Sequence, residues 1–133
     1  MISEDRTQSA VATYLRYQYP KAIFNSDLSG IRLTINQARK ASGTRSSRAF
    51  PDLVIYEKRR GFAGLFIELK KEGTRIFTKK GDLVSDPHVR EQHEMMKELT
   101  RRGYCARFAV GFNEAKLLID WYFKSERCEK EQI

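Results

Sequence analysis

The chain has 133 residues, which fits one domain with a substantial hydrophobic core. Its 25 Lys and Arg against 17 Asp and Glu give a formal net charge of +8, which favours a polyanionic partner; on charge alone, a basic enzyme with another kind of substrate remains the alternative. No signal-peptide pattern, membrane-length apolar run, disulfide framework or metal-ligand cysteine spacing is visible. These features exclude a membrane-spanning protein and a disulfide-rich scaffold, and they predict a reducing, cytoplasmic location.

The first predicted element is a helix over about residues 4–17, with Ser3 as its N-cap. Four residues at helical spacing form its expected buried stripe: Val11, Tyr14, Leu15 and Gln18. Glu4 falls on the same side as Gln8, Val11 and Leu15, so it could look toward the sheet; a surface residue that compensates the helix dipole is the equal alternative. Pro20 ends the helix.

A short strand is expected over residues 22–28, and a stretch of low apolar content follows at 32–48. Within it, the segment INQARKAS could form one or two helical turns that stop at Gly43. Five cations stand here with no acidic residue among them: Arg32, Arg39, Lys40, Arg45 and Arg48. Together with the neighbouring Ser, Thr, Asn and Gln they predict phosphate contacts; a solvated loop is the alternative.

Two β-rich runs, residues 53–56 and 65–69, flank a charged connection that contains Gly61, and this pattern predicts a hairpin. Alternation along the second run puts Leu65, Ile67 and Leu69 on one face and Phe66, Glu68 and Lys70 on the other. A turn at Arg60 and Gly61 would bring Asp52 beside Glu68 or Leu69. Two carboxylates and an ammonium at one end of a short sheet suit a metal site; an exposed Glu68–Lys70 pair on an edge strand is the alternative.

Residues 71–90 form a second long loop, basic in its first half, where Lys71 and Arg75 are further candidates for nucleic-acid contact. Its length and its Gly and Pro content predict a mobile flap beside the site. A helix from about Asp86 or Pro87 to Arg102 follows, with Asp86 as N-cap and Gly103 as its stop.

The inward stripe of this second helix is expected to contain one polar residue: Val89, Gln92, Met96 and Leu99. Gln92 could lie at the rim, or it could hydrogen-bond a metal-bound water or a ligating carboxylate. His88 and His93 lack the i, i+4 spacing of two ligands on one helix face, so we predict that each is a lone surface histidine.

The last predicted elements are a strand over residues 104–112 and a helix over 114–123 with Asn113 as its cap. Its expected buried residues are Ala115, Leu118, Ile119, Tyr122 and Phe123. The charged tail, residues 124–133, is expected to fray. Together, these elements predict one α/β domain over residues 1–133, with a mixed β-sheet flanked by helices in the order α-β-β-β-α-β-α.

Asp52 within Phe-Pro-Asp-Leu, followed by Glu68-Leu69-Lys70 on the next strand, resembles the PD-(D/E)xK nuclease signature. The helix that begins near Glu4, together with Gln92 and Gly103 before the last strand, makes the layout similar to the VRR-NUC branch over residues 4–122. The chain departs from that branch at residues 48–50, Arg-Ala-Phe, where the branch tends to have a glycine.

This resemblance implies a restriction-endonuclease-like core and a metal-dependent DNA endonuclease. It implies that Asp52, Glu68 and the Leu69 carbonyl hold Mg²⁺, for which Mn²⁺ substitutes, and that Glu4 binds the metal directly or through water. Lys70 would orient or help deprotonate the attacking water, or stabilise the pentacovalent phosphate, with stabilisation the preferred role.

The family further implies structure-selective cleavage of branched DNA, such as Holliday junctions or flaps. Junction resolution needs two active sites and therefore a homodimer, for which the aromatic residues Tyr17, Tyr19 and Trp121 are candidate interface material. The alternatives are a non-selective or restriction-type nuclease of the same fold, and a catalytically inactive nucleic-acid-binding module.

Overall fold

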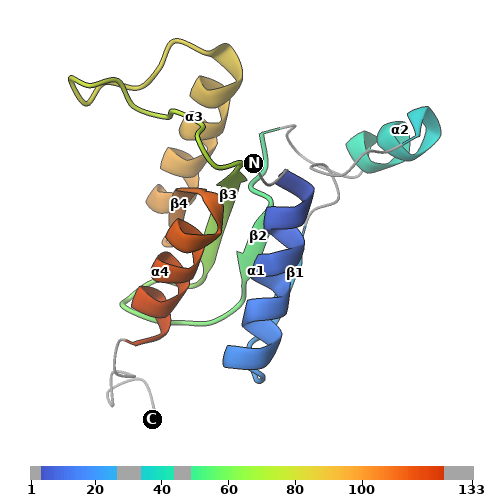
Figure 1. Cartoon of the computed structure of the whole chain (residues 1–133), viewed down its shortest axis with the longest axis vertical. Helices are drawn as coiled ribbons and strands as arrows, with labels where there is room; N and C mark the ends of the chain where they lie inside the picture. The colour runs from blue at the N-terminus through green and yellow to red at the C-terminus, as the bar shows by residue number, and fades with distance from the viewer. Residues whose placement is uncertain (1–3, 27–33, 44–48, 125–133) are drawn as a thin grey trace.

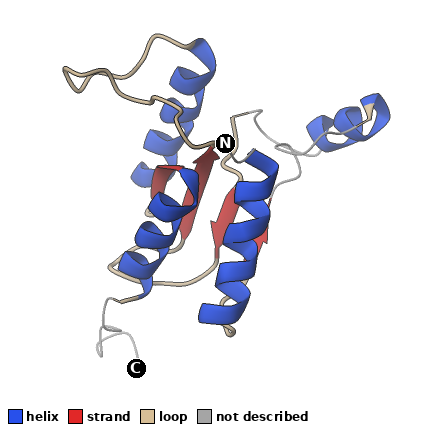
Figure 2. Ribbon diagram, viewed as in Figure 1, coloured by secondary structure: helices blue, strands red, loops and turns tan. Residues whose placement is uncertain are grey.

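The computed structural model describes residues 4–26, 34–43 and 49–124. Their elements, in chain order, are α1 (Glu4–Gln18), β1 (Phe24–Ser26), α2 (Ile35–Gly43), β2 (Leu53–Ile55), β3 (Leu65–Lys70), α3 (Pro87–Arg101), β4 (Cys105–Val110) and α4 (Gly111–Phe123). Figures 1 and 2 show one sheet between helices, with α1 and α4 on one face and α3 on the other. The predicted α/β order is confirmed, with α2 inserted between the first two strands.

The sheet has the strand order β1-β2-β3-β4, in which the first three strands are antiparallel and β3 runs parallel to β4. The parallel pair needs a crossover connection, and α3 provides it. Leu53 lies opposite Ile67 and Ile55 lies opposite Leu65, which confirms the predicted hairpin. Continued by one position, this register brings Asp52 to Glu68.

Strand β3 is buried on both faces because helices cover the sheet from both sides. Leu65, Ile67 and Leu69 pack with the α1 and α4 side of the core, which includes Val11, Leu15, Ile119 and Tyr122. Phe66 faces the other way and packs with Met96 and Leu99 of α3 and Ala106 of β4. The alternation predicted from the sequence therefore assigns Glu68 and Lys70 to the α3 face.

Helices α1 and α4 are joined by a carboxylate that accepts two tyrosine hydroxyl groups. Tyr14 donates to Oδ1 of Asp120 at 2.5 Å, Tyr19 donates to the same oxygen at 2.7 Å, and Lys116 Nζ lies 3.4 Å from Oδ2. Burial alone would raise the pKa of Asp120, but these three donors outweigh it and hold the pKa below its usual value. Burial, followed by the bond to Asp120, raises the pKa of Tyr14 to about 12.

Two predictions about α1 are wrong. Gln18 is exposed, whereas Gln8, which was predicted on the same side as Val11 and Leu15, is buried, and so is Thr7. Tyr19 is not an exposed interface residue, because its ring stacks on Phe123 at 4.3 Å between centroids. Tyr19 therefore covers the C-terminal end of α4.

Asn113 is not the N-cap of α4, which begins at Gly111 immediately after β4. Gly111 has a φ of +80°, a conformation that a glycine adopts without steric cost, so the strand turns into the helix earlier than the sequence predicted. The N–H of the N-cap residue Val110 donates to Oε1 of Glu114 at 3.1 Å, in place of a side-chain cap from Asn113.

Helix α2 stands away from the sheet in Figure 1. It begins with a capping box, in which the Gln37 N–H donates to Thr34 Oγ1 at 3.1 Å and the Thr34 N–H donates to Gln37 Oε1 at 3.0 Å. On the other side of the molecule, the loop between β3 and α3 folds back on itself through a bridge between Phe77 and Leu83, with Ile76 buried beneath it. None of the helices in the described ranges is long and apolar enough to cross a bilayer.

Candidate active site

Four polar side chains are buried together around the C-terminal end of β3. Asp52 is 6% exposed, Glu68 3%, Lys70 8% and Gln92 5%. Asp52 precedes β2, Glu68 and Lys70 belong to β3, and Gln92 belongs to α3. Burial of three ionisable groups carries a desolvation cost that an apolar core would avoid, and such clusters concentrate at functional sites.

Asp52 is held against β3 by a main-chain donor. Its Oδ2 accepts the N–H of Leu69 at 2.8 Å, in a buried hydrogen bond. The segment before it is fixed because Pro51 is fully buried and Phe50 packs edge-on against Phe66, with 5.9 Å between ring centroids. Since the N–H and C=O of one strand residue point to the same strand edge, the Leu69 carbonyl lies on the Asp52 side of β3.

Glu68 is held from the opposite side by α3. Its Oε1 accepts a hydrogen bond of 2.6 Å from Gln92 Nε2 and lies 3.7 Å from Lys70 Nζ. Strand alternation brings Glu68 and Lys70 to one face, as predicted. Gln92 reaches Glu68 because it belongs to the buried stripe of α3, whose predicted members Val89, Gln92, Met96 and Leu99 are all buried.

The start of α3 sets the position of Gln92 along the helix. Asp86 Oδ1 accepts the N–H of His88 at 2.8 Å and the N–H of Val89 at 3.4 Å, and Pro87 occupies the first turn. The predicted N-cap is therefore present. A helix that began one residue later would turn Gln92 away from Glu68.

His88 belongs to this cluster, which the sequence reasoning missed. Its Nε2 lies 3.1 Å from Gln92 Nε2 and accepts from it when the imidazole proton is on Nδ1. The ring is exposed, as predicted, but it is not a lone surface histidine. The signal was the i, i+4 spacing of His88 with Gln92, whereas the prediction rested on its spacing of five residues from His93.

The donor set is compatible with a hard divalent cation. Asp52, Glu68 and the Leu69 carbonyl offer oxygen atoms, which Mg²⁺ prefers. Gln92 Oε1 is a buried acceptor with no hydrogen-bond partner within the described ranges, so a water on the cation could donate to it. Among the described residues, no three or more His, Cys, Asp and Glu side chains are placed so that they could hold a metal ion together, so water or Glu4 would have to complete the coordination. Glu4 is the first residue of α1, but its side chain lies outside the described part.

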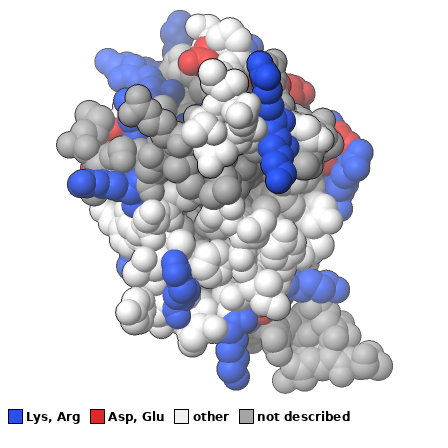
Figure 3. All heavy atoms as spheres, turned by 90° about the vertical axis from the view of Figure 1, so that its right-hand side faces the viewer, with Lys and Arg blue, Asp and Glu red and all other residues white. Residues whose placement is uncertain are grey.

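The structure describes four of the seven expected nucleic-acid-binding residues. Arg39 and Lys40 are exposed on α2, and Lys71 and Arg75 are exposed on the loop after β3. Arg32, Arg45 and Arg48 lie outside the described residues. Figure 3, which views the molecule from the α2 side, shows Lys and Arg spread over this face, with few Asp and Glu. In Figure 1, α2 and the loop both lie toward the end of the molecule where β3 ends.

The comparisons with known proteins find similarity among solved structures. No family model matches the chain, and no curated protein matches it. Among solved structures, the fold matches a chain described as a VRR_NUC domain protein, with a TM-score of 0.68 and 25% sequence identity. The match covers 94% of this chain and 91% of that chain. The match therefore spans nearly the whole length of both chains.

Proposed function

Because the chain folds as a VRR-NUC-like, restriction-endonuclease-like nuclease domain, we propose that it is a metal-dependent DNA endonuclease that hydrolyses phosphodiester bonds. The observation that carries the proposal is the buried convergence of Asp52, Glu68 and Lys70 where β3 ends. The net charge of +8 supports a polyanionic substrate. In an inactive binding module, two buried carboxylates would only repel the phosphate backbone of the bound DNA, so such a module would have no need for them.

We assign the metal to Asp52, Glu68 and the carbonyl of Leu69, with Glu4 as a further ligand. Bound Mg²⁺, or Mn²⁺ in its place, would supply an activated water and neutralise charge on the phosphate and the leaving oxygen. The hydrogen bonds from Leu69 N–H and from Gln92 would hold the two carboxylates in place before the ion binds.

The remaining residues of the cluster have distinct proposed roles. Lys70 stabilises the negative charge that develops on the phosphate, since a fixed ammonium in a water-poor site interacts strongly with it. Orienting or deprotonating the attacking water is the alternative role for this side chain. Gln92 positions Glu68, and His88 in turn positions Gln92 through the 3.1 Å contact.

We propose branched DNA, such as four-way junctions or flaps, as the preferred substrate. Seven cations would contact its phosphates: Arg32, Arg39, Lys40, Arg45, Arg48, Lys71 and Arg75. Paired incisions at a junction need two active sites, so we propose a homodimer. Tyr17, 85% exposed, and Trp121, 39% exposed, are available for its interface.

A cleavage panel tests this function directly. Linear duplex, single strand, flap and four-way junction are each incubated with the chain in Mg²⁺ and in EDTA. We expect divalent-dependent cleavage that is fastest on the branched substrates. Wild-type protein that binds these DNAs but cleaves none of them with Mg²⁺ or Mn²⁺ would refute the enzymatic proposal and leave the binding module.

Two substitutions of similar size test the assigned ligands. Asp52→Asn and Glu68→Gln should each lower the cleavage rate at least about 100-fold, in line with the loss of one group that stabilises the transition state. Both should also weaken Mn²⁺ binding measured by calorimetry. Glu72→Gln is the control, because Glu72 is an exposed carboxylate just after β3 and should leave both measurements unchanged.

A further inference from the structure

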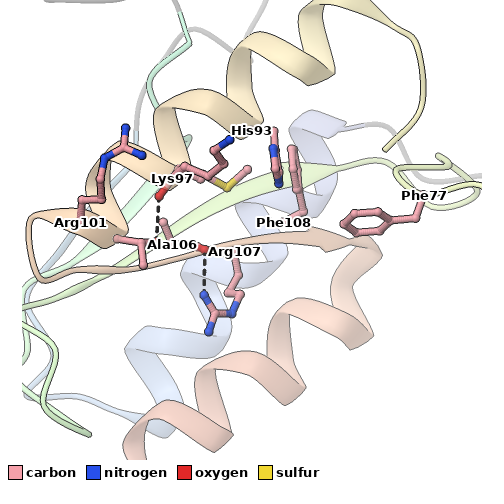
Figure 4. A pocket seen from close by; sticks show the side chains of 9 residues that line it. Phe77, His93, Lys97, Arg101, Ala106, Arg107 and Phe108 are labelled. Atoms are coloured by element: carbon pink, nitrogen blue, oxygen red, sulfur yellow. Dashed lines mark hydrogen bonds between the residues drawn. The ribbon is translucent and has the colours of Figure 1, made fainter. Parts of the chain in front are cut away.

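A groove of about 510 Å³ lies between α3 and β4, the edge strand of the described sheet (Figure 4). Phe77 stands at one end of it and Arg101 at the other, with His93, Phe108 and Lys97 between them. The volume falls within the range of about 300–1,000 Å³ that is typical of ligand-binding pockets. The site assigned above uses none of these side chains.

The groove begins next to the proposed active site. Phe108 is the register partner of Glu68 on the neighbouring strand, and it packs on the α3 face to which Glu68 also points. Adjacent strands lie about 4.8 Å apart. His93 directly follows Gln92 on α3. A DNA strand that leaves the active site across β4 would therefore enter this groove.

The apolar part of the groove offers aromatic rings. Phe77 is 51% exposed, although the loop that carries it is fixed by the bridge to Leu83. Phe108 is half-buried farther along. Phe77 lines the groove together with Met96, Ala106 and Phe108, so its ring belongs to an apolar surface that a flat partner can cover. Unpaired bases are suitable partners, because every base has a flat face that stacks on an aromatic ring.

The polar part of the groove is cationic. No Asp or Glu of the described residues lines it, whereas Lys97 and Arg101 do. Both cations make ion pairs along α3, Lys97 with Glu94 at 3.0 Å and Arg101 with Glu98. These pairs are solvent-exposed and therefore weak, so a phosphate can replace the carboxylates.

We propose that this groove binds a single-stranded segment of DNA, with bases on Phe77 and Phe108 and phosphates on Lys97 and Arg101. In a duplex the base faces are covered by their neighbours, so only an unpaired strand can use the two rings. The groove would hold the unpaired arm of a branched substrate, and this part of the proposal rests on the nuclease function proposed above. The binding itself is independent of cleavage.

The test measures binding of a short fluorescein-labelled oligo(dT) and of a matched duplex to the full chain in EDTA. Phe77→Ala should weaken oligo(dT) binding at least about fivefold and leave duplex binding unchanged, because one stacking contact is lost. The double variant Lys97→Gln with Arg101→Gln should reduce the slope of log K against log salt by about 0.7 for each phosphate contact removed. Photocrosslinking with a 5-iodouracil oligonucleotide should label Phe77, Phe108 or His93.

Matched controls exist on the other face of the sheet. Leu117→Ala removes an exposed apolar side chain from α4, and Arg16→Gln with Lys21→Gln removes two exposed cations. The controls should bind both DNAs like the wild type, and thermal unfolding should show that all variants are folded. Unchanged oligo(dT) affinity in both groove variants, or an equal loss in the controls, would overturn the proposal.

Two further outcomes decide its details. Equal losses of single-strand and duplex affinity in Phe77→Ala would overturn base stacking, and tighter binding of oligo(rU) than of oligo(dT) would overturn the assignment to DNA. Cleavage with Mg²⁺ is measured in parallel. If the wild type cleaves nothing, the nuclease proposal fails while the EDTA binding data still decide the groove; if it cleaves but the groove variants bind normally, the groove proposal fails alone.

Discussion

Replacing Lys70 with Met should change folding stability and metal affinity in opposite directions. Methionine keeps much of the length of the lysine side chain and removes its charge. In the structure the ammonium lies 3.7 Å from Glu68 Oε1, with the Lys70 side chain 10% exposed and that of Glu68 4% exposed. The two groups are therefore largely shielded from water, and the loss of one partner affects the other strongly.

The distance sets the expected magnitudes. At an effective dielectric constant of about 20, two unit charges at this separation interact by about 4 kcal/mol. Removal of one partner from a buried pair typically costs about 3–5 kcal/mol, and since Gln92 still donates to Glu68 we expect about 3 kcal/mol. A divalent cation competes with Lys70 for the same carboxylate. Removal of the Lys70 charge should therefore tighten Mn²⁺ binding at least about tenfold, which corresponds to 1.4 kcal/mol.

Urea unfolding in EDTA and calorimetric titration with Mn²⁺ measure the two effects, and cleavage of a branched substrate should fall in the same variant. Lys71→Met is the control, because Lys71 follows directly in the sequence but is exposed. Mn²⁺ affinity that is unchanged or weaker in a folded Lys70→Met protein would refute the placement of the ion beside Glu68. An equal gain in Mn²⁺ affinity in Lys71→Met would show that the effect comes only from the net charge of the protein.

Three further substitutions test hydrogen bonds at the site and elsewhere in the fold. Gln92→Leu should lower the free energy of unfolding in EDTA by about 1.5–3 kcal/mol, because it removes the charge-assisted bond to Glu68; unchanged urea midpoints would contradict that bond. The lowered pKa of Asp120 means that this carboxylate stabilises the fold above about pH 4 and that the contribution is lost as the pH falls further, so Asp120→Asn should flatten the acid side of the stability profile measured by circular dichroism. Asp86→Ala should cost about 1 kcal/mol in thermal unfolding through loss of the helix cap, and a smaller loss in Asp86→Asn would show that the cap is responsible.

Local patterns in the sequence were sufficient to predict most of the fold. Period-two alternation in residues 65–70 correctly separated the two faces of β3, because both faces are buried by different helices. The stripe on α3 was predicted residue for residue, including Gln92, since Asp86 and Pro87 fix where that helix begins. These signals depend on spacing along one element, which the sequence contains.

Features that depend on contacts between elements were predicted less well. The pairing of Tyr19 with Phe123 and Asp120 joins residues about a hundred positions apart, and nothing near Tyr19 in the sequence indicates it. The groove combines Phe77 from a loop with Phe108 from β4 and Lys97 from α3. The role of His88 was not predicted for a different reason. Its partner four residues along the helix is Gln92, whereas the prediction considered only a second histidine as a partner.

The position of the site follows from where the sheet ends. Strand β2 begins at Leu53, so the ladder with β3 stops before Leu69, whose N–H would otherwise have no strand partner on that side. The carboxylate of Asp52 takes the place of that partner at 2.8 Å. The same hydrogen bond therefore completes the sheet and fixes a proposed metal ligand. Because an asparagine oxygen can still accept the Leu69 N–H while lacking the negative charge, Asp52→Asn separates these two roles, and a loss of Mn²⁺ binding in that variant without a comparable loss of stability would be due to the ligand alone.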